Sequence, residues 1–242
     1  MIADEVRQAL VAAANNPTPE KVAGMNRFFK SYEGGYSHGD QFLGITVPVI
    51  RMVAKKYASV SLDDIEQLLA SPWHEVRELA AIILVMQTKR ASLQTRKQLC
   101  EFYLNHTAGI NNWDIVDTSC RDVVGEYLLR AEPAESAILQ KLAMSADMWE
   151  RRIAMVSTWA FIRQHQLDHT FTIATQLIHD KQDLIHKAVG WMLREAGKRD
   201  EVRLKEYLNH YASQLPRTAL RYAIERFTPE ERARYLAVKR SI

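Results

Sequence analysis

The segment Asn111–Asp117, with the sequence NNWDIVD, places an indole ring close to two carboxylates. On a helix, Trp113 and Asp117 are four residues apart and share one face. The face of an indole ring attracts cations, and a neighbouring carboxylate attracts them more strongly. This pair therefore suits a substrate that carries a positive charge or gains one in the transition state.

Two later residues extend this chemistry. Arg152 occupies a comparable position in the next similar segment, and Trp191 follows Lys187 by one helical turn. No histidine, serine or cysteine stands out beside them as a nucleophile. Cleavage at the anomeric carbon of a sugar develops an oxocarbenium-like cation. A purine alkylated at a ring nitrogen is itself cationic and leaves without a general acid, so one carboxylate could stabilise the sugar cation and orient a water molecule.

Structural roles compete with this interpretation. Asp117 and Arg152 could form an ion pair between repeats, and spacing alone does not separate that role from catalysis. Both tryptophans could be core residues, but neighbouring apolar residues already supply buried faces, which favours exposure of Trp113 and Trp191. Asp114 is a rival carboxylate, which we expect to point elsewhere and to act as a helix cap. We assign Trp73, Trp149 and Trp159 to packing.

Apolar residues recur at helical spacing along almost the whole chain, and no alternating strand pattern is convincing. Ser61 with Asp64 resembles an N-cap region, and Pro72 and Pro133 are placed as helix starts or breaks. We therefore predict an all-α protein with about ten to fourteen helices.

A repeat becomes visible when the tryptophans are aligned. Similar blocks begin at Pro72, Asn112, Met148 and Asp183, and the tryptophans that open the first three are 40 and 36 residues apart. This period is typical of HEAT-like helix pairs, which stack because no pair buries its own apolar face. We expect a right-handed α-solenoid, one domain over residues 1–242, with the four blocks lining a concave face. The alternative is a compact helical bundle in which the spacing is accidental.

The composition is that of an ordinary folded protein. Lys and Arg number 32 against 29 Asp and Glu, a net charge of +3 that permits nucleic-acid binding without arguing for it. Cys100 and Cys120 lack a CxxC spacing, and the eight histidines lack a metal-ligand pattern, so we expect no disulfide, metal or cofactor. The N-terminal segment does not read as a signal peptide and no apolar stretch is long enough to span a membrane, so we expect a cytoplasmic protein.

Five stretches together resemble the AlkD-type DNA alkylation repair proteins, which are HEAT-like-repeat DNA glycosylases. Each stretch is weak alone, but all five occur in the expected order over nearly the whole chain: FLGITVPVIR (42–51), NNWDIVD (111–117), WERRIAMV (149–156), KAVGWMLREAGK (187–198) and RTALRYAIE (217–225). The resemblance implies a monofunctional enzyme that hydrolyses the N-glycosidic bond of N3- and N7-alkylated purines in double-stranded DNA. It also implies that the damaged base is not drawn into a pocket.

Carried over by position, the resemblance makes Asp117 the catalytic carboxylate and Trp113 with Trp191 the aromatic pair at the lesion's deoxyribose. Arg152 then grips the DNA backbone nearby. Further candidate DNA contacts, which by default could be solvated surface residues, are Lys187, Arg194, Arg51, Thr46 and Lys198. Phe28 and Thr46 depart from the family pattern, where tyrosine and glutamine can occur, and residues 32–41 form a glycine-rich insertion.

Two other functions remain open at this stage. Helical-repeat folds host many unrelated roles. The chain could be a non-catalytic nucleic-acid-binding solenoid or a scaffold for protein interactions. A carboxylate at position 117 favours the enzyme over the former, and DNA affinity that falls steeply with salt would exclude the latter. We expect a monomer, because a repeat array with its own end caps is self-sufficient.

Overall fold

The computed structural model describes residues 2–14 and 17–239. Within these ranges the regular structure is helical, apart from an isolated bridge between Gln41 and Trp73. The prediction of an all-α fold is therefore confirmed. The chain forms two compact units, residues 1–119 and 120–242, and each is described by itself. One domain over residues 1–242 and a right-handed superhelix stay predictions.

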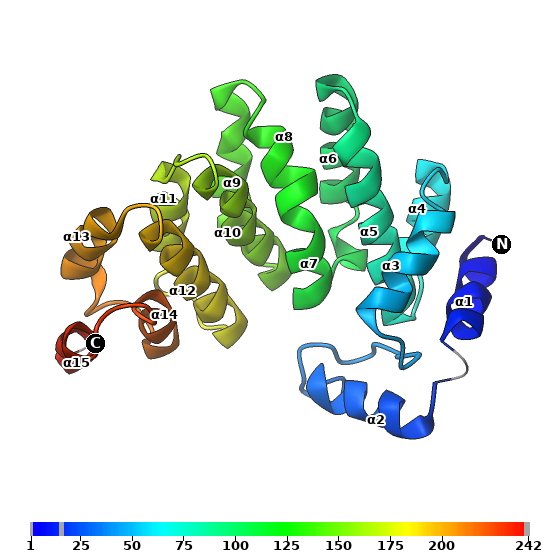
Figure 1. Ribbon diagram of the computed structural model, residues 1–242, viewed down its shortest axis with the longest axis horizontal. Coiled ribbons are helices and arrows are strands. Elements are labelled where there is room, and N and C mark those ends of the chain that lie inside the picture. Colours follow the sequence, from blue (N-terminus) through cyan, green and yellow to red (C-terminus); the bar gives the residue numbers. More distant parts are fainter. Residues whose placement is uncertain (1, 15–16, 240–242) are drawn as a thin grey trace. The chain divides into compact units, whose positions relative to one another are not determined.

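The first unit is built around α5, whose residues are buried on almost every side. Helices α3 and α4 both pack on α5, and α1 packs on α3 and α4. Helix α2 contributes no buried residue and lies beside the N-terminal ends of α3 and α5 (Figure 1). The elements of this unit are α1 (Ile2–Ala13), α2 (Pro19–Phe28), α3 (Val47–Lys56), α4 (Leu62–Leu69), α5 (His74–Arg90), α6 (Leu93–Asn105), the 3₁₀ turn η1 (Thr107–Gly109) and α7 (Trp113–Cys120).

Local signals in the sequence account for several helix starts. The N-cap predicted at Ser61 is confirmed, because its hydroxyl accepts from the Asp64 N–H at 3.1 Å while the Asp64 carboxylate accepts from the Ser61 N–H at 3.2 Å. This reciprocal pair satisfies two backbone groups that a helix end leaves open. Pro72 lies just before α5, and Pro133 opens a 3₁₀ turn, as expected of breaks.

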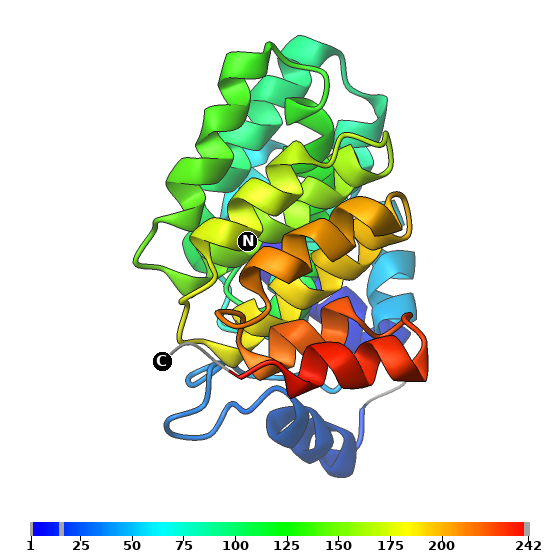
Figure 2. The same ribbon diagram turned by 90° about the vertical axis from the view of Figure 1, so that its left-hand side faces the viewer.

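The second unit repeats a simple arrangement of helix pairs. Helix α10 packs between η2 and α12, and α12 packs on α14, while α9, α11 and α13 each pack on a member of this row. Figure 2 shows α13, α14 and α15 lying next to one another in orange and red. The elements are the π-helical η2 (Arg121–Gly125), α8 (Glu126–Leu128), the 3₁₀ turn η3 (Pro133–Ser136), α9 (Ala137–Ala143), α10 (Met148–Ile162), α11 (Asp168–Gln176), α12 (Asp183–Gly197), α13 (Glu201–Tyr211), α14 (Arg217–Ala223) and α15 (Pro229–Ala237).

The four repeated blocks of the sequence correspond to helices. They become α5, α7 with its continuation through η2 and α8, α10, and α12. In the second unit these are the successive members of the central row, which is the order that a helical repeat produces. Cys100 and Cys120 are both buried, as expected. Among the described helices, none combines the length and apolar character that a membrane crossing requires.

Glycine allows two helix contacts in the second unit to be unusually close. A Cβ at Gly190 on α12 would lie 2.4 Å from the Ala219 carbonyl oxygen on α14, and one at Gly125 would lie 2.4 Å from the Ser157 carbonyl oxygen on α10. Both obstacles are backbone atoms, which move only if the helices separate. The small residues therefore set the spacing of the row.

We predict that Gly190→Ala lowers the free energy of unfolding by about 1–3 kcal/mol, because the added methyl group forces α12 away from α14. Urea denaturation of wild type and variant measures this difference. The matched control is Gly24→Ala on α2, where an added Cβ meets nothing within 4 Å. That change should be neutral or stabilising by up to about 1 kcal/mol, since alanine is the better helix former. Equal effects of the two substitutions would contradict the packing argument.

Candidate functional site

Trp113 and Asp117 lie on the same helix, as predicted. Trp113 is the first residue of α7, where its N–H donates to the Asn112 side-chain oxygen at 2.8 Å, and Asp117 follows one turn later. Both side chains are partly exposed. Residues four apart share one face of a helix, so one face of α7 carries an indole and a carboxylate that are both partly exposed.

The indole of Trp113 is held by aromatic residues from the N-terminal part of the chain. Its ring stacks on Phe29 with centroids 5.5 Å apart and meets the exposed Phe28 edge-on at 5.8 Å. The ring N–H donates to the Tyr36 hydroxyl at 3.1 Å. The contacts with Phe29, Phe28 and Tyr36 together restrict the orientation of the Trp113 ring before any substrate binds.

The glycine-rich segment 32–41 braces the start of α7. The Tyr36 hydroxyl donates to the Phe28 carbonyl oxygen at 3.3 Å, and the Ser37 hydroxyl donates to that of Phe29 at 2.7 Å. The Asn112 amide then donates to the Ser37 oxygen at 2.7 Å. Gly34 and Gly39 have φ angles of +79° and +93°, which a side chain would disfavour, so glycine lets the segment turn twice in this short space. The sequence showed an insertion here but not its purpose.

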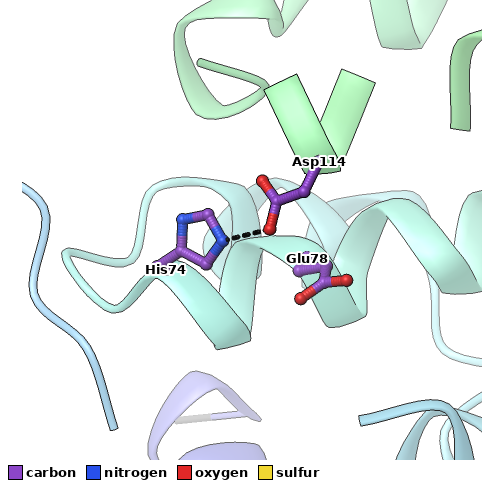
Figure 3. Close-up of side chains that lie close together, drawn as sticks. All are labelled: His74, Glu78 and Asp114. Atoms are coloured by element: carbon purple, nitrogen blue, oxygen red, sulfur yellow. Dashed lines mark hydrogen bonds and ion pairs between the residues drawn. The ribbon is translucent and has the colours of Figure 1, made fainter. Parts of the chain in front are cut away.

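A buried polar cluster lies beneath the same turn of α7. His74 Nε2 and Asp114 Oδ2 are 2.8 Å apart (Figure 3). On the other side of the ring, His74 Nδ1 lies 3.4 Å from Asp40 Oδ2. Arg77 donates to Asp40 at 2.7 Å and to the Asn111 side chain at 3.1 Å. Burial opposes a charge on His74, but the hydrogen bonds with Asp114 and Asp40 outweigh it and raise the pKa of His74 to about 9. A protonated imidazole between two carboxylates therefore ties α5 to α7.

Two glutamates of α5 border this cluster. The Glu75 carboxylate accepts the backbone N–H groups of Leu43, Gly44 and Ile45 at 2.8–3.1 Å, which anchors the loop before α3. Glu78 is 2% exposed, and its Oε1 has no hydrogen-bond partner. Burial and the negative charge of Asp114 raise the pKa of Glu78 to about 8.

A cavity of about 540 Å³ opens against this cluster. Its walls come from α2 and the start of α3, including Phe28 and Thr46, and its floor includes His74, Glu78 and Asp114. The cavity could not be predicted from the sequence, because its walls come from segments far apart in the chain.

Asp114 is buried whereas Trp113 is partly exposed, so the two side chains point in different directions, as expected. The Asp114 Oδ1 accepts the Ile115 N–H in the first turn of α7 at 2.8 Å, and its Oδ2 has a further partner in the buried His74.

The second unit holds Arg152 and Trp191 on helices that pack together, α10 and α12. Arg152 is buried, and it donates to the Leu184 carbonyl oxygen near the start of α12 at 2.5 Å. Trp191 is partly exposed and meets Trp159 edge-on at 5.1 Å. The Arg121 guanidinium lies over Trp159, 5.0 Å from the ring centre. Trp159, which we assigned to packing alone, is therefore a partly exposed support for Trp191.

Comparisons with known proteins identify the family of this chain. The family model of the DNA alkylation repair enzymes matches residues 6–227. The chain belongs to this family. A solved structure described as a predicted DNA alkylation repair enzyme from Enterococcus faecalis shares the fold, with a TM-score of 0.66 and 18% identity over 88% of this chain and 98% of that one. The search of curated proteins gave no match.

The candidate DNA contacts of this family member are placed in both units. In the second unit each of the three basic candidates forms an ion pair with an acidic side chain. Lys187 lies 2.8 Å from Asp183, and Lys198 lies 2.7 Å from Glu195. Arg194 pairs with Glu225 and Glu195. In the first unit Arg51 and Thr46 are exposed on α3 and at its N-cap, where the threonine hydroxyl makes no capping bond. A phosphate that contacts one of the three paired side chains would have to displace an acid already in place, so the gain from each contact is only the difference between two ionic partners.

We predict that the free energy of unfolding falls as pH rises from about 4.5 to about 9. In the folded chain Glu78 keeps its proton up to pH about 8 instead of 4.5, and His74 up to about 9 instead of 6.5. Both pKa values are raised by folding, so each contribution is complete below the unfolded value and is lost as pH passes the folded value. Urea denaturation in chelator-containing buffer should show this fall in wild type.

The matched variant for this test is Glu78→Gln, which keeps the shape of a neutral glutamic acid but has no proton to lose. Its stability should depend less steeply on pH than that of wild type between pH 4.5 and 8. Parallel curves for the two proteins would show that Glu78 is ionised in the folded chain throughout.

Proposed function

We propose that this protein is a monofunctional DNA glycosylase that hydrolyses the N-glycosidic bond of cationic N3- and N7-alkylated purines in double-stranded DNA. The products are the free base and an abasic site, so the reaction belongs to base excision repair. The observation that carries the proposal is the partly exposed pair of Trp113 and Asp117 on one face of α7, in a chain of the DNA alkylation repair enzyme family.

The chemistry requires little from the protein because the substrate is already activated. The alkylated base carries a positive charge and departs as a neutral molecule, so no general acid is needed. Positive charge then grows on the deoxyribose as the bond breaks. The Asp117 carboxylate stabilises that charge and orients the attacking water, while the Trp113 ring faces the cation with its electron-rich surface.

The contacts around Trp113 support a role for it beyond packing. Phe28, Phe29 and Tyr36 fix the ring, yet leave it partly exposed. A side chain held in place loses no rotamer freedom when substrate binds, so its contact with a developing cation is fully available in the transition state. Trp191, supported by Trp159, supplies the second aromatic surface of the proposal.

The remaining candidates serve to hold DNA. We propose that Lys187, Arg194, Lys198, Arg51 and Thr46 contact the phosphate backbone, because phosphate contacts position a protein on DNA without reading sequence. Arg152 is assigned to the backbone near the lesion. Its burial and its bond to the Leu184 carbonyl oxygen also give it a structural task, the support of the first turn of the helix that carries Trp191.

We predict that Asp117→Asn lowers release of 7-methylguanine from duplex DNA by at least about 100-fold, because an amide stabilises the sugar cation poorly. Single-turnover release of free base measures the effect, and DNA binding should persist in the variant. Wild type should release hypoxanthine, a neutral base, far more slowly. Full activity of Asp117→Asn would reject this residue as the catalytic carboxylate. A wild type that binds DNA but releases no base would favour the non-catalytic binding protein.

We predict that Trp113→Ala and Trp191→Ala each slow release of 7-methylguanine by about 2- to 30-fold, since a cation–π contact contributes about 0.5–2 kcal/mol. Trp73→Ala is the control, because this partly exposed tryptophan caps α5 and has no assigned role in the reaction. Thermal melting confirms that all three variants are folded. An equal loss in Trp73→Ala would mean that the effect reflects stability and not contact with the substrate.

A further inference from the structure

The cluster of His74, Glu78 and Asp114 has the composition of a metal site. One nitrogen and two carboxylate oxygens, one from each residue, lie within 4.8 Å of one another, and all three side chains are buried (Figure 3). Imidazole and carboxylate together are ligands that divalent first-row transition metals prefer. His74 and Glu78 are one turn apart on α5, so they face the same side, and Asp114 reaches them from α7.

The surroundings of His74 favour this use of the ring. Asp40 lies 3.4 Å from Nδ1, and Arg77 in turn donates to Asp40 at 2.7 Å. A metal-bound histidine commonly donates its second N–H to a carboxylate, which fixes the ring and directs the other nitrogen at the ion. Here Nε2 is the nitrogen that faces Asp114, and one ligand atom of Glu78 lies within 4.8 Å of those of His74 and Asp114.

A second observation points to a ligand that the protein itself does not supply. Glu78 is 2% exposed and its Oε1 is buried without a hydrogen-bond partner. An unsatisfied buried carboxylate oxygen is costly, and native structures usually pair such an atom with a donor, a water molecule or an ion. A cavity of about 540 Å³ lies directly against the cluster, since His74, Glu78 and Asp114 all help to line it.

We propose that His74, Glu78 and Asp114 bind a divalent first-row transition metal ion such as Zn²⁺. Because metal ligands must be deprotonated, binding of the ion releases any proton that these three side chains hold. It joins α5 to the first turn of α7, beside Trp113. This role is structural, and it is independent of the reaction proposed for Asp117.

The proposal departs from the sequence-based expectation of no metal. That expectation rested on the lack of a recognisable ligand spacing among the histidines. His74 and Glu78 alone make no recognised motif, and Asp114 lies 36 residues after Glu78, so only the fold brings the set together.

The test is titration of the full chain with Zn²⁺ after treatment with a chelator and dialysis. Calorimetry should show saturable binding of one ion per chain, and Zn²⁺ should raise the melting temperature. Glu78→Gln should weaken binding by at least about tenfold and abolish the thermal shift. Co²⁺ provides a spectroscopic probe, since ligation by protein groups should change its visible absorption in wild type and not in Glu78→Gln.

The matched control is His106→Asn, which removes an imidazole that lies 3.3 Å from Glu66 in the same unit but outside the cluster. This variant should bind Zn²⁺ as wild type does. If Glu78→Gln does not fold, as judged by circular dichroism, Asp114→Asn takes its place. Absence of stoichiometric binding by wild type would overturn the proposal, and so would unchanged binding in the folded cluster variant. Neither result depends on base release, so the proposed glycosylase activity stands or falls separately.

Discussion

The hydrogen bond between His74 and Asp114, 2.8 Å long, joins the first turns of α5 and α7 inside the first unit. Asp114 is the residue after Trp113, so this bond holds the first turn of α7 against α5 directly beside Trp113. Asp117 follows one turn later on the face that Trp113 occupies. Charged groups are retained in a protein interior only when each has a partner, and Asp40 and Arg77 complete the set here.

The segment before α3 adds a second constraint at the same place. Phe29, Tyr36 and Ser37 contact Trp113 or Asn112, while Glu75 on α5 accepts three backbone N–H groups of the loop that follows. The loop, α5 and α7 therefore hold one another. A side chain held by contacts with three segments is better placed to stabilise a transition state than one held by a single helix. Its conformational freedom is already restricted, so little entropy is lost during the reaction.

The sequence predicted the helices well and the polar contacts poorly. Helical periodicity, the cap at Ser61 and the four repeated blocks all depend on neighbours in the chain, and each has its counterpart in the structure. The partners of Asp114, the unpaired oxygen of Glu78 and the contact of Tyr36 with Trp113 depend on residues brought close by folding. Trp159 is another example. Its spacing in the sequence resembles that of a core residue, but its partial exposure depends on how the neighbouring helix packs against it.

The pairing of Lys187, Arg194 and Lys198 with acids has a consequence for movement along the genome. Each phosphate that these side chains contact must displace a carboxylate already in place. When the protein binds undamaged duplex, each cation therefore replaces one ionic partner with another, and the net gain in binding free energy is small. For a protein that acts on DNA as we propose, this keeps residence on intact sequence short. A protein that dissociates readily from intact DNA can survey more base pairs in a given time than one whose Lys and Arg side chains have no acidic partners.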